Sequence, residues 1–189
     1  MAKSEKTSLN VRKLTYLAVL TAIVVVLQSV IAPIIGGATG LSPALVLIPI
    51  VLGAAVCGVG GGAWLGAVFA FIVLFDPTTV PFLQFNPILT VLLVFAKGAG
   101  SGALVGLIFT LLSKVNKYLA VVVAAISAPI LNTGIFVVGC ILFFSELTGF
   151  GVYTLFISIN FLIELIVNVT IVPVLYYLLG VTRVFNVNE

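Results

Sequence analysis

The stretch from Asn86 to Ser113, NPILTVLLVFAKGAGSGALVGLIFTLLS, determines the fold class of this chain. About 20 mainly apolar residues are enough for a helix to cross a lipid bilayer, and this stretch exceeds that length with a single charge, Lys97, inside it. An ionisable side chain at membrane depth costs about 2.5–3.5 kcal/mol on insertion scales, so it typically marks a polar pathway, a binding site or an internal ion pair. The stretch therefore predicts a membrane-spanning helix with a polar group near its centre.

The remainder of the chain has the same apolar character. Hydrophobic residues make up 62% of the 189 residues and charged residues 7%, and the mean hydropathy of +1.41 leaves too few polar groups to cover a soluble globule. We predict one all-α integral membrane domain over residues 1–189, a bundle of six transmembrane helices. The glycine-rich connection 33–42 is predicted to be too irregular for a helix. The predicted helices are 12–32, 43–57, 61–75, 88–113, 118–145 and 152–179.

The distribution of Lys and Arg predicts how the bundle is oriented. With six crossings, both termini and the turns 58–62 and 114–117 lie on one side of the membrane, and seven of the eight basic residues are on that side. The opposite loops carry Asp76 and Glu146 and no basic residue. The positive-inside rule therefore predicts that both termini are cytoplasmic. The basic N-terminus could also imitate a signal peptide, but its apolar run is long enough to span, so we interpret it as an uncleaved first helix.

Several polar side chains are predicted to lie near the middle of the membrane. At 1.5 Å per residue, Lys97 and Glu164 lie about 16 Å and about 18 Å from the outer ends of their predicted helices. Asn160, Glu164 and Asn168 are spaced four residues apart and share one face of the sixth helix. Asn132 is near the middle of the fifth helix. One amine, one carboxylate and several amides are therefore expected at about the same level of the bundle.

Two interpretations of this polar group compete. Lys97 and Glu164 could form an ion pair that satisfies itself and determines how the helices pack. Alternatively, the group lines a water-accessible pocket whose occupant completes the hydrogen bonds. We favour the pocket, because Gly98, Gly102 and Gly106 already provide a small-xxx-small surface for close helix packing.

Two further residues are candidates for the pocket. Trp64, the only tryptophan, could form a ring-stacking wall, although simple packing also explains it. Asn86, together with Asp76 and Gln84, could lie at the mouth of the pocket, although such residues are equally expected in a solvated loop.

The missing motifs narrow the function. The chain has no histidine, no HExxH, no paired aspartates and no nucleotide-binding motif, and Cys57 and Cys140 fall in different apolar segments. Membrane hydrolases, metalloenzymes and quinone oxidoreductases therefore lose support, and we expect no enzyme activity, metal or cofactor. The absence of two matching halves weakens a secondary transporter built from inverted repeats.

Over its whole length, this layout resembles the substrate-binding S-components of energy-coupling factor (ECF) transporters. The local motif is small-xxx-small in the first helix, Ala18-Val19-Leu20-Thr21-Ala22. The glycine-rich first outer connection and the Asn86-Pro87 entry to the fourth helix strengthen the resemblance. It implies that Ala18 and Ala22 face a transmembrane coupling subunit, that two partner ATPases supply the energy, and that the chain lies in the cell membrane of a prokaryote.

The resemblance also implies a high-affinity binding subunit for a water-soluble vitamin or related micronutrient. Pockets in the family draw on the first outer loop and on the fourth to sixth helices, which carry Lys97, Asn132, Asn160 and Glu164. On chemistry, Lys97 would suit a carboxylate-bearing ligand, with Glu164 and the asparagines accepting from hydroxyl or amide donors. The candidate set contains few aromatic residues, which slightly favours a small flexible acid such as pantothenate over a stacked pterin or flavin.

Two other classes of function are open at this point. One is an autonomous ion- or proton-coupled transporter in which Glu164 titrates beside Lys97. The other is a structural membrane subunit in which the two charges only pack against each other.

Overall fold

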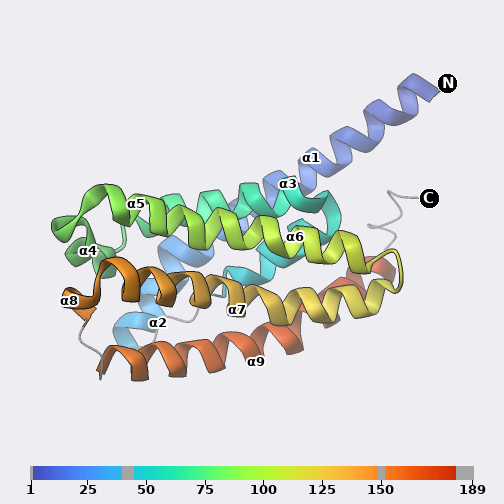
Figure 1. Ribbon diagram of the computed structural model, residues 1–189. Coiled ribbons are helices and arrows are strands. Elements are labelled where there is room, and N and C mark those ends of the chain that lie inside the picture. Colours follow the sequence, from blue (N-terminus) through green and yellow to red (C-terminus); the bar gives the residue numbers. More distant parts are fainter. Residues whose placement is uncertain (1, 40–44, 149–151, 182–189) are drawn as a thin grey trace.

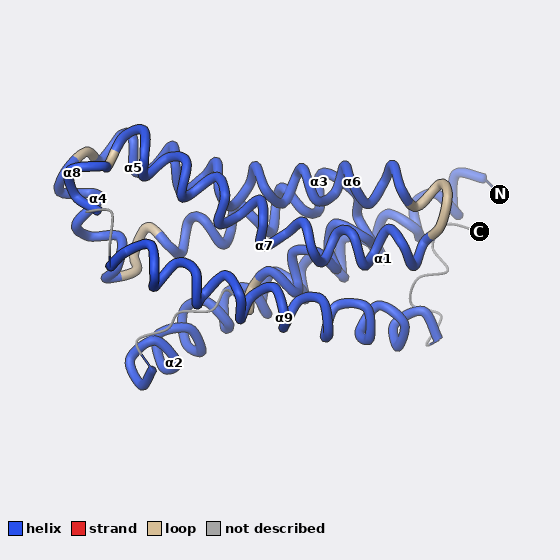
Figure 2. The backbone as a smooth tube through the Cα atoms, turned by 60° about the horizontal axis from the view of Figure 1, so that its bottom comes forward, coloured by secondary structure: helices blue, strands red, loops and turns tan. Residues whose placement is uncertain are grey.

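The computed structural model describes residues 2–39, 45–148 and 152–181, and in these ranges the chain forms helices and short turns, without a strand. The long helices lie alongside one another in an elongated bundle (Figures 1 and 2). In chain order, the elements are α1 (Ala2–Val26), the π-helical segment η1 (Leu27–Ile31), α2 (Ala32–Thr39), α3 (Leu47–Val73), the 3-10 turn η2 (Pro77–Thr79), α4 (Val80–Phe85), α5 (Pro87–Phe95), the π-helical segment η3 (Ala96–Gly100), α6 (Ser101–Leu112), α7 (Lys117–Phe143), α8 (Ser145–Thr148) and α9 (Val152–Val181).

Five of the described helical stretches are long and apolar enough to cross a membrane, as judged by length and composition. The predicted all-helical, membrane-embedded fold is confirmed, whereas the count of six crossings stays a prediction. The predicted helices 43–57 and 61–75 fall together within one of the five stretches. The five are Val11–Ile35, Leu47–Val73, Pro87–Leu112, Lys117–Phe143 and Ile159–Gly180.

Helix α3 changes direction at Gly58, whose φ of 69° lies in the left-handed region that favours glycine. Beyond this residue the chain runs back along itself. The evidence is the close approach of Gly61 to Gly53: a Cβ at Gly61 would lie 2.7 Å from the carbonyl oxygen of Gly53. In a straight helix these two residues would be about 12 Å apart along the axis. Helix α3 is therefore a hairpin with arms 47–57 and 59–73 (Figure 1).

The second arm of α3 packs backbone to backbone against η3 and α6. A Cβ at Gly102 would overlap the carbonyl oxygen of Gly62, and a Cβ at Gly66 would overlap that of Gly98. Gly106 faces the backbone just after the α3 turn. The prediction that Gly98, Gly102 and Gly106 form a close-packing surface is confirmed, and four-residue spacing on both helices explains why the glycines align.

The prediction that residues 33–42 contain no helix is wrong for the part that the structure describes. Helix α2 runs through Ala32–Thr39, and residues 40–44 lie outside the described residues. Pro33 is the second residue of α2 and directly follows η1, with the helix continuing across the boundary because the Ala32 N–H bonds the Leu27 oxygen. The hydrogen bond that the proline cannot make therefore coincides with the π-helical irregularity. The apolar Ile34 and Ile35 then continue the first membrane stretch.

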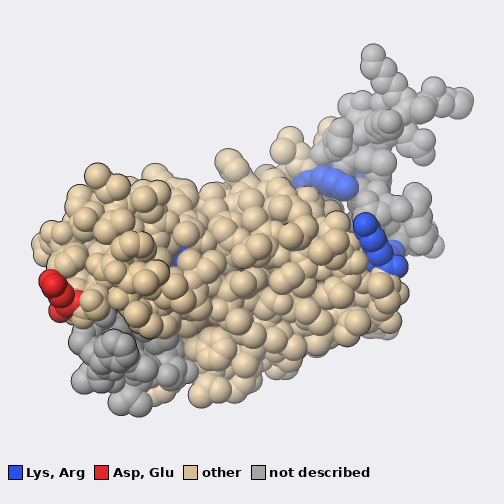
Figure 3. All heavy atoms as spheres, viewed as in Figure 1, with Lys and Arg blue, Asp and Glu red and all other residues tan. Residues whose placement is uncertain are grey.

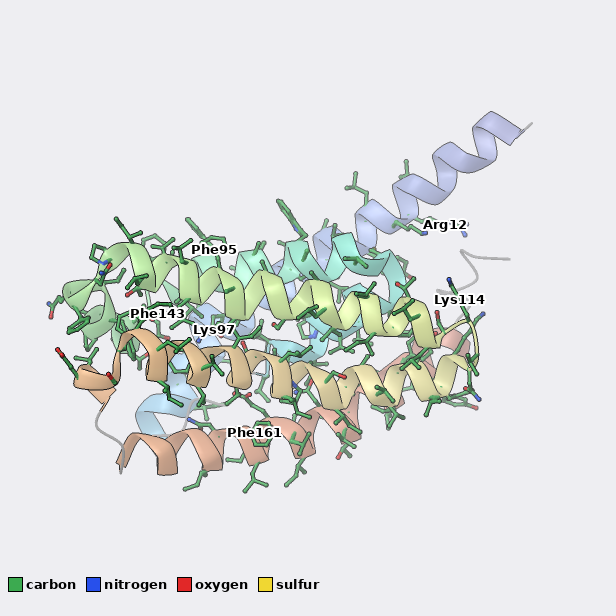
Figure 4. All side chains as sticks on the ribbon, in the orientation of Figure 1. Arg12, Phe95, Lys97, Lys114, Phe143 and Phe161 are labelled. Atoms are coloured by element: carbon green, nitrogen blue, oxygen red, sulfur yellow. The ribbon has the colours of Figure 1, made fainter. Side chains whose placement is uncertain are left out.

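Charged side chains on the surface separate to the two ends of the bundle (Figure 3). Arg12 and Lys114 lie at one end, which we call the basic end, together with the first turns of α1 and the last turns of α9 (Figures 1 and 4). Asp76 and Glu146 belong to the connections at the opposite end, which we call the acidic end. Lys97 and Glu164 are inside, between these two ends.

Candidate functional site

Lys97 lies in the π-helical segment η3 and extends into the bundle toward α7 (Figure 4). Its ammonium nitrogen is 4.5 Å from the ring centroid of Phe136 on α7 and 5.9 Å from that of Phe69 on α3. The negative face of an aromatic ring attracts a cation, by about 0.5–2 kcal/mol depending on how far the pair is desolvated. The rings thus hold the amine in the interior while its N–H groups keep their capacity to donate hydrogen bonds.

Glu164 of α9 is the acidic residue with the largest electrostatic effect on Lys97, ahead of Asp76. Its side chain is buried, and the hydroxyl of Thr133 on α7 lies 3.4 Å from the carboxylate oxygen Oε2. Lys97 and Glu164 therefore lie within electrostatic reach of each other, in keeping with their matching depths on the two predicted helices.

The asparagines of the site differ in how their amides are satisfied. Asn168 is fully buried; its Nδ2 donates to the backbone oxygen of Glu164 at 2.9 Å, and its Oδ1 has no partner. Asn132 of α7 is also buried, with Oδ1 unpartnered. Asn160 is half-buried and lies on α9 one turn before Glu164. Asn132 on α7 and the three candidates on α9 thus belong to two helices that pack against each other, with Thr133 next to Glu164 at the contact.

The structure does not bring the remaining two candidates to Lys97. The side-chain oxygen of Asn86 accepts from the backbone N–H of Leu89 at 3.1 Å and caps α5, so its local role is structural. Trp64 is 54% exposed, and its indole N–H donates to the hydroxyl of Thr21 on α1 at 3.2 Å. Trp64 therefore packs across the α1–α3 contact on the outside of the bundle.

An aromatic cluster lies next to the amine on the side of the acidic end. The Phe82 ring is 5.8 Å from that of Phe136 and 5.2 Å from that of Phe144, and the Phe144 ring is 5.7 Å from that of Phe85. The expectation of an aromatic-poor site is wrong. These phenylalanines look like ordinary membrane residues in the sequence, and only the antiparallel approach of α7 brings Phe136 to Lys97.

A comparison with protein families matches residues 12–176 to the ECF transporter, substrate-specific component, family. This chain belongs to that family. Its members are substrate-specific subunits of ECF transporters rather than enzymes, and ATP hydrolysis belongs to partner subunits. Comparisons with curated proteins and with solved structures gave no match.

Around Lys97 the apolar bundle therefore contains an amine, a carboxylate and several amides, and the Oδ1 atoms of Asn132 and Asn168 have no hydrogen-bonding partner. One polar residue was missed in the sequence: Gln28, which is buried in η1. The sequence did contain a signal for this residue, because Gln28 is the only side-chain amide in the predicted first helix 12–32.

Proposed function

We propose that this ECF substrate-specific component is the high-affinity binding subunit for a water-soluble vitamin or related micronutrient, in the cell membrane of a prokaryote. A transmembrane coupling subunit and two ATPase subunits would complete the transporter. The observation that carries the proposal is the Lys97 ammonium, held inside the bundle by two rings, with the Glu164 carboxylate and the open Asn132 amide nearby.

The chemistry of the site supports a ligand that carries a carboxylate. Lys97 has three N–H donors and no acceptor, so an anionic group suits it, and a charge-assisted hydrogen bond is about twice as strong as a neutral one. Glu164 and Asn132 would accept from hydroxyl or amide groups of the same ligand. Pantothenate has this combination, and the rings of Phe136 and Phe69 also suit an apolar or aromatic portion.

The first prediction is that the purified subunit binds one vitamin without partner subunits. We expect one member of a panel of pantothenate, biotin, riboflavin, thiamine, folate, nicotinate and pyridoxine to raise the melting temperature in detergent. A ligand at 1,000 times its Kd stabilises by about 4 kcal/mol, which is roughly 8–16 °C for a chain of this size. A panel without any shift would contradict the proposal, and ion-driven uptake by the lone chain in liposomes would support an autonomous transporter instead.

We further propose six crossings with both termini in the cytoplasm. The reversal of α3 at Gly58 supports two separate crossings where length and composition alone count one. The separation of surface charge supports the orientation, because the basic end would face the cytoplasm and the acidic end the outside (Figure 3).

Ala18 and Ala22 are our proposed contact for the coupling subunit. Both are exposed and lie one turn apart on α1, so they offer a flat surface on which another helix can pack closely. The second prediction is that Ala18→Leu/Ala22→Leu abolishes co-purification with the coupling subunit while vitamin binding stays unchanged. The control is Val174→Leu, an exposed position on α9, which should co-purify normally. Normal co-purification of the double variant would show that the partner docks elsewhere.

A further inference from the structure

Hydrogen bonding divides the buried polar side chains of the described residues into two groups. Five of the seven make side-chain hydrogen bonds within the protein: Thr79, Thr90, Ser101, Glu164 and Asn168. The other two are Asn132, whose buried Oδ1 has no partner, and Gln28, for which no side-chain hydrogen bond is seen among the described residues; Asn168 likewise keeps an unpartnered Oδ1. Both carry a carboxamide, which has two donors and one acceptor oxygen to satisfy.

The position of Gln28 needs an explanation because a carboxamide placed in an apolar bundle costs free energy unless its hydrogen bonds are completed. Gln28 is only 7% exposed, and it lies in the π-helical segment η1. Such segments are rare and occur frequently at functional sites. The other π-helical segment of the described chain, η3, carries Lys97. One of the two π-helical segments therefore carries Gln28, and the other carries Lys97.

The packing of α1 on α3 determines the level of Gln28 along the bundle. Leu20 and Leu65 both lie against Gly53, so they mark one level on α1 and on the second arm of α3. Both helices run from that level toward the acidic end. Gln28 is eight residues, or about 12 Å, further along α1, and Phe69 is four residues, or about 6 Å, further along α3.

The Lys97 ammonium lies near the level of Phe69, 5.9 Å from the centroid of that ring. Along the bundle axis, Gln28 is about one helical turn beyond Phe69 toward the acidic end. Asn132 is four residues before Phe136 on α7, which places it about one turn from the amine toward the basic end. Measured along the bundle axis, Gln28 and Asn132 thus lie on either side of the level of Lys97, over about two helical turns.

We infer that Gln28 is a ligand-binding residue of the site that Lys97 and Asn132 define, and that its ligand is an elongated polar molecule. The ligand places an anionic or acceptor group against Lys97 and hydrogen-bonding groups near both amides, about 12 Å apart. This inference rests on the proposed function. It adds a contact from the first helix, which carries none of the pocket residues that the sequence predicted.

The third prediction tests this with Gln28→Met, which removes the amide and keeps the side-chain length. Without ligand, we expect the melting temperature to be unchanged or higher, since a buried unpartnered group is lost. With the panel compound that stabilises the wild type, we expect the dissociation constant to rise at least tenfold. The matched control is Ser29→Ala: Ser29 is the next residue of η1, is exposed, and bonds only the backbone oxygen of Val25. It should bind like the wild type.

Two outcomes would overturn the inference. A ligand-free melting temperature of Gln28→Met several degrees below that of the wild type would show that the amide is structural. An unchanged dissociation constant for the compound that the wild type binds would show that Gln28 does not contact it. If no panel compound stabilises the wild type, the proposed function fails and this inference fails with it; if the compound binds wild type and variant equally, only this inference fails.

Discussion

Replacing both Gly66 and Gly102 with alanine is expected to abolish cooperative folding of the bundle. Each added Cβ would overlap a carbonyl oxygen on the facing helix, and backbone cannot move aside as a flexible side chain can. Overpacking costs about 1–3 kcal/mol at each site, and separating the helices also weakens dispersion contacts along the α3–α6 interface. Gly102→Ala alone should lower the melting temperature by about 2–4 °C per kcal/mol lost, measured by circular dichroism in detergent.

The matched control for this prediction is Gly100→Ala. Gly100 lies two residues before Gly102, at the end of η3, but a Cβ there would meet no atom within 4 Å. Its melting curve should match that of the wild type, because alanine also favours the helix more than glycine does. If Gly102→Ala melted like Gly100→Ala, the close approach of α3 and α6 would be wrong.

Lys97→Met is expected to weaken vitamin binding by at least tenfold while the bundle stays folded, and Lys97→Ala should do the same. The substitution removes the cationic donor but leaves an apolar side chain between Phe69 and Phe136. Hydrogen bonds to charged groups contribute about 1.5–3 kcal/mol, so binding should weaken by roughly 10- to 150-fold or fall below detection. Titration calorimetry with the vitamin that stabilises the wild type measures the loss, and circular dichroism checks the fold.

Lys114→Met is the control for charge, since it removes the same group from the exposed turn at the basic end. It should leave the dissociation constant unchanged. The double variant Lys97→Met/Glu164→Leu provides the sharpest test, because it removes both charges and leaves neither one buried alone. Wild-type binding by this variant would show that the two charges only support packing.

Much of the fold could be predicted because lipid imposes strong rules on a sequence. Apolar runs of sufficient length indicated the helices, and the glycine spacing at Gly98, Gly102 and Gly106 indicated a close contact that the structure shows. Helix α2 was missed because its glycines and proline are residues that usually interrupt a helix. In the structure, the π-helical segment η1 directly precedes α2, and the helix continues past Pro33.

The site was predicted only in part, because charge is visible in a sequence and neighbours are not. Lys97, Glu164 and Asn132 were found as polar groups in apolar surroundings. Phe136 was overlooked because a phenylalanine in a membrane helix is unremarkable until another helix places an amine over its ring. Gln28 was overlooked because its unusual feature, burial without a partner, exists only in the packed bundle.

By itself, then, the sequence determined that this chain is a membrane-embedded helical bundle with an amine and a carboxylate in its interior. Hydropathy and charge are properties of single residues and short segments, so they can be read without knowing the contacts. Only the tertiary structure decided that the amine lies against Phe136 and Phe69 and that Trp64 lies outside. Such contacts depend on the register between helices far apart in the chain; for Phe69 and Lys97, the glycine contact of α3 with η3 and α6 sets this register by backbone sterics.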